Sequence, residues 1–336
     1  MTTTNTRTPV LTVEGLQVAI PTPRGTVKAV RDLSFAIYPG ETFALVGESG
    51  SGKSMTCRAI LRLIHQPGRI TGGKVLFHDQ DLAQLSERAL QQVRGGGISM
   101  IFQNPMTALH PVLTIERQLV ETLSLAMTKP EARARALQLL KQVGIPDPEQ
   151  KLKEYPHQLS GGQRQRVMIA IAIARGPQLL LADEPTTALD VTIQAEILRL
   201  LAELQRANHM ALLLVSHDLG VVSQVADRVG VMYAGQIMET ADTRTLLGRP
   251  AHPYTIGLIR SMPRLEEEER QPLEPIPGSP PDLATLPPGC PFAPRCAWAT
   301  DICKEEVPVV ELAEGHWSRC HRAEEIYREL GGGRVE

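Results

Sequence analysis

The 336-residue sequence lacks a long apolar run, an apolar signal segment at its N-terminus and an excess of positive charge. Its longest apolar stretch, Val167–Ala174, lies between two arginines. A bilayer core of about 30 Å requires about 20 apolar residues, so this stretch is too short to cross one. The 35 basic and 37 acidic side chains give a net charge of −2, which argues against a nucleic-acid partner.

The N-terminal segment at 1–10 is rich in threonine and has none of the features of a secretory signal. We therefore expect the protein to stay in the cytoplasm, and if it acts at a membrane, other chains must supply the spans. Apolar residues make up 42% and charged residues 21% of the chain, as in ordinary soluble proteins. The length suits one large domain with an appendage.

Short apolar runs at 42–46, 179–182 and 211–215 alternate with segments of helical spacing at 131–143 and 191–206. Continuous apolar runs of this length, bounded by loops, are typical of strands that are buried on both faces of a parallel sheet. The alternation predicts an α/β fold with a largely parallel central sheet.

The composition changes after Pro250. An acidic run occupies 266–269, and prolines recur at positions 272, 275, 277, 280, 281, 287 and 288. Neither a helix nor a central strand accepts proline at this density. We expect an extended connector that leads to a small module containing cysteines.

A glycine-rich segment, Gly47–Ser54, follows the apolar run at 42–46 and fits the pattern G-x-x-x-x-G-K-S/T. Glycines let backbone N–H groups turn toward phosphate oxygens, and the N-terminus of a following helix favours negative charge. In this setting Lys53 is predicted to bridge the β- and γ-phosphates of a nucleotide, and Ser54 to bind Mg²⁺. A plain flexible loop is the alternative, and the strand–loop–helix context disfavours it.

Two carboxylates follow the apolar run at 179–182. Asp183 would project from the carboxyl edge of the sheet, where ligands bind in open α/β folds. At that edge it can hold Mg²⁺ through water, and Glu184 can polarise an attacking water. An acidic turn would be the simpler interpretation if the phosphate loop were not present.

The pentapeptide Leu159–Gln163 (LSGGQ) precedes a segment of helical character, Gln165–Ala174. Ser160 and the N–H groups of Gly161 and Gly162 are therefore predicted at a helix N-terminus. That geometry suits a helix cap, and it equally suits binding of an anion that arrives from outside.

The order of these three motifs resembles the ATP-binding cassette (ABC) ATPase family, the engines of ABC transporters, over nearly the whole chain. The resemblance implies an ABC-type P-loop ATPase of α/β class, with a mixed, largely parallel sheet and a helical subdomain at about 104–175. It also implies ATP hydrolysis with Mg²⁺. In this family the pentapeptide contacts the nucleotide of a partner subunit. The chain is therefore expected to be one of two subunits that together form the active ATPase.

The resemblance assigns roles to further residues. His217 would orient the γ-phosphate and water, and Gln103 would touch Mg²⁺ or water and move with a docked membrane subunit. Asp190 lies in the loop that crosses between two ATPase halves. Many relatives stack an aromatic residue on adenine, and the corresponding position here holds Arg24, whose planar guanidinium can also stack.

These arguments yield a defined set of candidate residues. The predicted catalytic residues are Lys53, Gln103, Glu184 and His217, and the predicted Mg²⁺ ligands are Ser54, Gln103 and Asp183. The predicted nucleotide contacts are Arg24, Gly47, Ser49, Gly50, Ser51, Gly52, Lys53 and Ser54, with Ser160, Gly161, Gly162, Gln163 and Asp190 serving the nucleotide of the partner.

Two later segments, His252–Thr255 (HPYT) and Ile276–Pro281 (IPGSPP), resemble the C-terminal region of oligopeptide and dipeptide importer ATPases. The resemblance implies the D-type subunit of a peptide uptake system, peripheral to the cytoplasmic face of the inner membrane. Such systems combine two different ATPases, two transmembrane permeases and an extracytoplasmic binding protein. The implied domains are an ABC ATPase domain at 1–248 and a C-terminal extension at 249–336.

Four of the five cysteines, Cys290, Cys296, Cys303 and Cys320, lie in this extension. Clustering in a cytosolic chain indicates metal rather than disulfides. Thiolates suit an iron–sulfur cluster or structural zinc, and the close C-x2-C pairs usual for zinc are absent. Relatives in this branch carry a [4Fe–4S] cluster here, so the resemblance favours a structural cluster over Zn²⁺ or free thiols. Cys57 is expected to be a small buried apolar side chain.

Two other functions remain open. ATPases of the same branch also serve importers of nickel chelates, opines or glutathione, and no residue of an ATPase subunit contacts the cargo. A non-transport ABC ATPase, such as a DNA-repair or translation factor, usually carries long coiled coils or two fused cassettes. This sequence has one cassette and no heptad run, which disfavours that alternative.

Overall fold

The computed structural model describes residues 8–23, 25–187, 189–262 and 274–330. The chain divides into two compact units and passes between them several times. Unit 1 comprises Met1–Val10, Tyr38–Glu41 and Gln84–Leu213, and unit 2 comprises Leu11–Ile37, Thr42–Ala83 and Leu214–Glu336.

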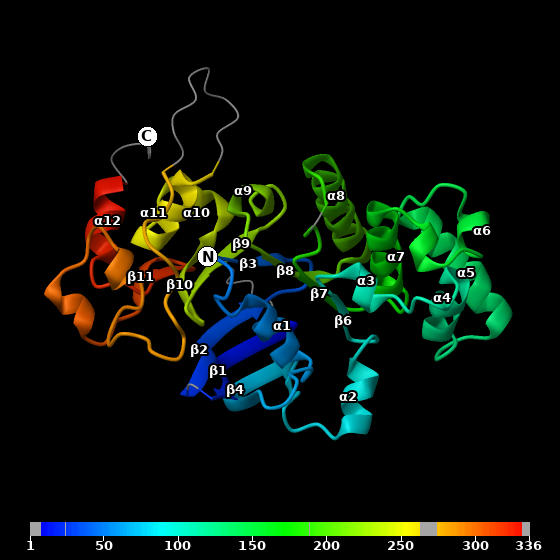
Figure 1. Cartoon of the computed structure of the whole chain (residues 1–336), viewed down its shortest axis with the longest axis horizontal. Helices are drawn as coiled ribbons and strands as arrows, with labels where there is room; N and C mark the ends of the chain where they lie inside the picture. The colour runs from blue at the N-terminus through cyan, green and yellow to red at the C-terminus, as the bar shows by residue number, and fades with distance from the viewer. Residues whose placement is uncertain (1–7, 24, 188, 263–273, 331–336) are drawn as a thin grey trace, which may run out of the picture. The chain divides into compact units, whose positions relative to one another are not determined.

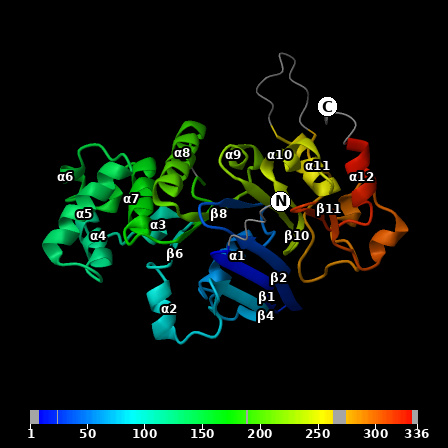
Figure 2. The same cartoon turned by 180° about the vertical axis from the view of Figure 1, so that it is seen from behind.

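Unit 2 contains an antiparallel sheet with the strand order β2-β1-β4-β5, of which β2, β1 and β4 are labelled in Figure 1. Leu11, Val13 and Leu16 of β1 are buried and pair with the flanking strands, and the view from behind shows β1, β2 and β4 side by side as well (Figure 2). The register shifts next to Gly15, whose φ of 56° lies in the region that glycine favours. The strands are β1 (Leu11–Thr22), β2 (Gly25–Ile37), β4 (Arg69–Phe77) and β5 (Gln80–Asp81).

A second sheet in unit 2 runs in the order β11-β12-β10-β9-β3. The strands β3 and β9 are parallel, and the other neighbours are antiparallel. Ala234 and Gly235 both have positive φ at the turn between β9 and β10, as a two-residue hairpin turn of type I′ requires. The C-terminal segment thus adds two strands to this sheet. The bounds are β3 (Thr42–Val46), β9 (Arg228–Tyr233), β10 (Gln236–Asp242), β11 (Val310–Ala313) and β12 (His316–Ser318).

Short helices complete unit 2. The extended connector predicted after Pro250 is interrupted by α11, which begins at Pro253 because proline fits the first turn of a helix. The acidic run at 266–269 and Pro272 lie outside the described residues. The helices are α1 (Lys53–Ile60), α9 (Leu219–Val222), α10 (Thr243–Gly248), α11 (Pro253–Arg260), η2 (Ala293–Arg295), η3 (Asp301–Lys304) and α12 (Ala323–Leu330).

Unit 1 joins a parallel strand pair, β6 and β7, to a group of helices in which α3, α4 and α5 contact α7. Helix α7 is buried along much of its length, with Val167, Ile169 and Ala170 fully covered. The elements are α2 (Glu87–Val93), β6 (Ile98–Ile101), α3 (Pro105–Ala108), α4 (Ile115–Leu123), α5 (Lys129–Gln142), α6 (Pro148–Lys151), η1 (Pro156–Gln158), α7 (Gly161–Ile173), β7 (Leu179–Asp183) and α8 (Val191–Asn208).

The predicted α/β class is confirmed. The helices expected at 131–143 and 191–206 are α5 and α8, and the three expected strands are β3, β7 and β8 (Ala211–Ser216). Helix α5 starts where Thr128 and Glu131 form a reciprocal capping box with Pro130 in the first turn. Among the described residues, no helix is both long and apolar enough to span a membrane.

Candidate functional site

The segment Gly47–Ser54 forms the predicted strand–loop–helix turn in unit 2. All five residues of β3 are buried, and α1 starts at Lys53. Gly47 and Gly52 have φ of 150° and 105°, and a Cβ at either position would collide with a backbone carbonyl, that of Met232 or that of Ala29. Only glycine therefore permits both the backbone conformation and the close approach of this loop to its neighbours.

Lys53 is nearly fully buried, and its ammonium group folds back over the loop. Its Nζ donates to the carbonyl oxygens of Gly47 at 2.7 Å and Glu48 at 2.9 Å, and to Oγ of Ser51 at 3.3 Å. The loop thus holds a positive charge at the N-terminus of α1, where an anion is already favoured. Ser54 lies in the first turn of that helix.

Two predicted catalytic residues of unit 1 meet at the ends of the parallel strands β6 and β7. Ile101 pairs with Ala182, so Gln103 and Glu184 each follow the paired ends by two residues. Nε2 of Gln103 donates to Oε2 of Glu184 at 2.9 Å, and the hydroxyl of Thr187 donates to the same oxygen at 2.9 Å. The Glu184 carboxylate is therefore oriented by two neutral donors.

The backbone at this strand end is constrained. Asp183 is only 1% exposed, and Glu184 has a φ of 45°, in the left-handed region that non-glycine residues rarely adopt. A strained backbone persists only where the surrounding structure maintains it, and such positions are concentrated at functional sites. Asp183 and Glu184 thus occupy the sheet edge at which the sequence predicts them.

The pentapeptide caps α7, which begins at Gly161, four residues before the predicted helical segment. Oγ of Ser160 accepts from the Gln163 backbone N–H at 3.2 Å, and Oε1 of Gln163 accepts from the Ser160 N–H at 3.1 Å. A Cβ on Gly162 would lie 3.2 Å from Ile193 Cγ2, so the missing side chain lets the start of α8 approach. Asp190 caps α8 by accepting from the Ile193 N–H at 3.0 Å.

His217 is exposed directly after β8 in unit 2. It lines a hollow with residues 218, 219, 258, 261 and 262 of the same unit. The predicted adenine contact, Arg24, lies outside the described residues. Unit 2 thus carries the phosphate loop and His217, and unit 1 carries Gln103, Asp183, Glu184, the pentapeptide and Asp190.

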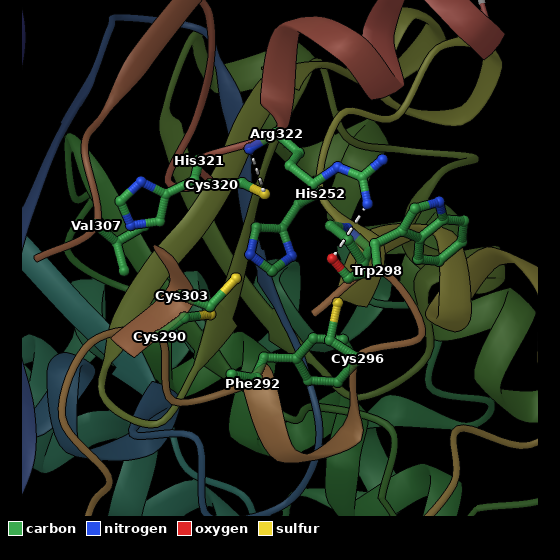
Figure 3. Close-up of a pocket in the computed structure, with 12 residues that line it drawn as sticks. His252, Cys290, Phe292, Cys296, Trp298, Cys303, Val307, Cys320, His321 and Arg322 are labelled. Carbon is green, nitrogen blue, oxygen red and sulfur yellow. Dashed lines mark hydrogen bonds between the residues drawn. The ribbon is translucent and has the colours of Figure 1, made fainter. Parts of the chain in front are cut away.

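The four C-terminal cysteines line one cavity of unit 2 (Figure 3). Burial raises the pKa of Cys290, and it raises the pKa of Cys296 to about 11 and that of Cys320 to about 12. The Arg322 backbone N–H donates to Sγ of Cys320 at 3.4 Å. Thiolates in this cavity would thus require a compensating positive charge. Cys57 is fully buried elsewhere, as expected.

His252 lines the same cavity and supplies a donor without an acceptor. Its Nδ1 accepts from the Tyr254 backbone N–H at 3.0 Å, which places the proton of the neutral ring on Nε2. Burial lowers the pKa of His252 to about 3, and a weak hydrogen bond with the Arg319 backbone opposes this effect. No acceptor lies within normal hydrogen-bond geometry of the buried Nε2. A sulfur-rich anionic group in the cavity would fit this orphaned donor.

The cysteines do not form a preformed site for a single ion. In the part of the chain that the structure describes, no group of three or more His, Cys, Asp or Glu side chains is arranged to hold a metal ion. Tetrahedral zinc requires sulfurs that converge to about 3.8 Å from one another. The cluster that the resemblance implies therefore stays a prediction.

Sequence reasoning missed three residues around the phosphate loop: Glu48, Tyr254 and Arg295. Glu48 occupies a variable position of the loop motif, and the other two come from the C-terminal extension, yet all three are joined by hydrogen bonds. The sequence pointed to one of the three, because Tyr254 belongs to the HPYT segment that resembles importer ATPases. It gave no indication of Glu48 or Arg295. Long-range pairs such as these have no local pattern that predicts them.

Comparisons with known proteins agree with this geometry. The family described as "ABC transporter" matches residues 30–187, and the family described as "Oligopeptide/dipeptide transporter, C-terminal region" matches residues 238–303. A dimeric ATP-binding cassette in a post-hydrolysis state with ADP and Pi has 29% identity and a TM-score of 0.63, covering 70% of this chain and 99% of that chain.

Curated relatives match along almost the whole length. The dipeptide transport ATP-binding protein DppD of Bacillus subtilis is 50% identical over 315 residues, which are 93% of this chain and 94% of that protein. The oligopeptide transport ATP-binding protein OppD of the same organism is 48% identical over 314 residues, 92% of this chain and 88% of that protein. The chain therefore belongs to the ABC transporter family of ATPases, in its oligopeptide/dipeptide transporter branch.

Proposed function

We propose that this chain is the ATP-hydrolysing subunit of an ABC importer for di- and oligopeptides. The observation that carries the proposal is the joint presence of a complete set of ATPase motifs and a C-terminal region of the oligopeptide/dipeptide type in one chain. In the proposed assembly the chain lies at the cytoplasmic face of the inner membrane. It pairs with a second, homologous ATPase and with two permeases, and a binding protein outside the membrane delivers the peptide.

The proposed chemistry is phosphoryl transfer from ATP to water. Lys53 neutralises charge on the β- and γ-phosphates, and the glycine N–H groups of the loop bind phosphate oxygens. Glu184 accepts a proton from the attacking water, and Gln103 and Thr187 fix the direction of its carboxylate. His217 orients the γ-phosphate. Catalysis of this kind depends mainly on positioning and charge stabilisation.

Magnesium suits the donor set of this proposal. The Ser54 hydroxyl, the Gln103 amide oxygen and the Asp183 carboxylate are oxygen donors, which Mg²⁺ prefers. When bound, the ion would neutralise charge on the phosphates. Asp183 is well suited to this role because its side chain is buried at a strand end and cannot be displaced easily.

The pentapeptide serves the partner's nucleotide in this proposal. Ser160, Gly161, Gly162 and Gln163 begin α7, so their donors meet an anion at a helix N-terminus. Closure of two ATPases around ATP would move the permeases, and hydrolysis would separate the ATPases again. Asp190 would contribute at the same boundary.

We further propose that Cys290, Cys296, Cys303 and Cys320 hold a [4Fe–4S] cluster. The cavity shared by the four thiols and the buried N–H of His252 support this assignment. The role would be structural, because the proline-rich segment at 274–300 has few regular elements from which to build a core.

The function is tested by co-expressing the chain with its partner ATPase and permeases and reconstituting the complex in vesicles with the binding protein. We expect ATP-dependent uptake of a labelled dipeptide. Glu184→Gln should retain ATP and abolish steady-state turnover, while Lys53→Ala should lose nucleotide. Turnover of Glu184→Gln near that of the wild type would refute the role of Glu184, and uptake of a nickel chelate in place of peptide would change the cargo.

The cluster is tested separately by anaerobic purification. We expect about four irons and four sulfides per chain, lost in Cys296→Ser. One zinc ion per chain, or no metal, would overturn the cluster and leave the ATPase assignment in place.

A further inference from the structure

Glu48 is held at three points, and two of them come from the C-terminal extension. Its backbone N–H donates to the Tyr254 hydroxyl at 2.8 Å, and its carbonyl accepts from Lys53. Its carboxylate accepts two hydrogen bonds from Arg295, at 2.6 Å to Oε2 and 2.9 Å to Oε1. The three contacts fix the backbone and the side chain of Glu48, the second residue of the phosphate loop.

Arg295 is itself fixed in place. Its side chain is only 6% exposed, and its Nε donates to the Pro277 carbonyl at 2.8 Å. Its guanidinium also donates to the Tyr233 hydroxyl at 3.2 Å and lies 5.8 Å from the ring centres of Tyr233 and Phe292. A planar guanidinium held on several sides presents two of its N–H groups to a carboxylate in one geometry.

The turn that carries Arg295 is bracketed by two of the clustered cysteines. The Cys290 carbonyl oxygen accepts from the Ala293 N–H, and the Ala293 carbonyl oxygen accepts from the Cys296 N–H. These two bonds hold both ends of η2. The Cys290 N–H in turn donates to the Cys303 carbonyl at 2.8 Å. The position of Arg295 therefore depends on the fold of the cysteine segment.

The pair has a direct electrostatic consequence for an anionic ligand. An unpaired carboxylate at position 48 would repel a triphosphate bound by the same loop, and Arg295 neutralises it. Tyr254 meanwhile satisfies an N–H of the loop and so holds its backbone in one conformation. Both effects concern binding of the nucleotide. Arg295 and Tyr254 act through Glu48, and their contacts do not involve the reacting atoms.

We infer that Arg295 and Tyr254 are positioning residues of the phosphate loop, through which the C-terminal extension raises the affinity of the ATPase for nucleotide. The inference rests on the proposed ATP site. Because coupling between two sites is reciprocal, bound nucleotide also stabilises the cysteine segment. The extension is thus part of the nucleotide site as well as an addition to the fold.

The test is an equilibrium titration of the full-length chain with a fluorescent ATP analogue and Mg²⁺. We expect Arg295→Gln to weaken binding about tenfold, because it leaves Glu48 unpaired beside the phosphates. The double variant that also carries Glu48→Gln should recover most of the loss, because the repulsive charge is gone. Tyr254→Phe, which removes only the hydroxyl, should weaken binding about threefold.

Arg328→Gln in α12 is the matched control, since its ion pair with Glu324 is exposed and belongs to the same extension. Wild-type affinity in Arg295→Gln would overturn the inference. So would a double variant as weak as Arg295→Gln, because a damaged fold is not rescued by removing one more charge. Failure of the wild-type chain to bind MgATP would instead overturn the proposed function.

Discussion

Nε2 of Gln103 lies 2.9 Å from Oε2 of Glu184, so the two residues form a hydrogen-bonded pair at the ends of neighbouring parallel strands. The pair explains how the carboxylate keeps its direction although its backbone is in a strained conformation. It also links two motifs that lie far apart in the sequence. A displacement of the Gln103 loop would change the orientation of the proposed base.

Gln103→Ala should lower kcat for ATP hydrolysis in the assembled complex by about tenfold, which corresponds to about 1.4 kcal/mol of the activation barrier. KM for ATP should change by a smaller factor than kcat, because the phosphate loop carries most of the binding. Steady-state kinetics with a coupled phosphate assay gives both constants. Gln138→Ala, an exposed change on α5, is the control, and an unchanged kcat in Gln103→Ala would refute the role.

The phosphate loop and the helix caps can be predicted from sequence, because the residues that form them are close together in the chain. The order strand, glycine-rich loop, helix is encoded within the segment 42–60, and steric rules for glycine explain it residue by residue. The capping residues of α7 and α8, Ser160 and Asp190, are likewise encoded within four residues of the helix start. Such features require no knowledge of the rest of the fold.

The contacts of the C-terminal extension could not be predicted in this way. Arg295 and Glu48 are separated by 247 positions, and no periodicity connects them. The added strand β12 is only three residues long, and it was missed because the segment is short and lies beyond a proline-rich stretch. Long-range pairing of short elements is decided by tertiary packing, which local propensity does not describe.

Ser160→Ala should separate a structural role of the pentapeptide from its proposed role in the partner's site. Loss of the cap should cost about 1 kcal/mol of unfolding free energy. ATP affinity of the isolated chain should not change, whereas hydrolysis by the assembled complex should fall by more than the stability loss explains.

Thr114→Ala is a matched control for Ser160→Ala, because the Thr114 hydroxyl likewise caps a helix, α4, by accepting from the Arg117 backbone N–H at 3.3 Å. It should show a similar stability loss in urea unfolding and normal hydrolysis. Equal hydrolysis rates in the two variants would mean that Ser160 only caps its helix.

Glu239→Ala should destabilise unit 2 more than an ordinary surface change. The carboxylate is fully buried on β10, where it accepts from the backbone N–H groups of Ala251 and His252 at 2.7 and 2.9 Å and contacts His316 Nε2 at 2.9 Å. Its removal leaves three buried groups without a partner, and we expect a loss of about 3 kcal/mol or more.

Urea unfolding followed by circular dichroism measures the loss in Glu239→Ala. Glu311→Ala on β11 is the control, since that side chain is exposed and its removal should change stability by less than about 0.5 kcal/mol. A loss in Glu239→Ala as small as in the control would show that β10, β12 and the start of α11 are held together by other contacts.

His252→Asn should keep the cap of α11 and remove the donor that lines the cysteine cavity. The asparagine side-chain oxygen can still accept from the Tyr254 N–H, but it cannot carry a ring N–H to the position of Nε2. If the cysteines hold the proposed cluster, iron and sulfide at purification should stay near the wild-type ratio. Visible absorbance should then bleach in air about tenfold faster, because a hydrogen bond to sulfur is lost.

The control for this change is His209→Asn, an exposed residue with positive φ at the end of α8, where asparagine is well tolerated. Its bleaching rate should equal that of the wild type. Equal rates in all three proteins would show that the Nε2 proton does not act on the group held by the cysteines. Loss of iron already at purification would instead indicate that the ring fills space, and His252→Phe would then restore the metal content whereas His252→Asn would not.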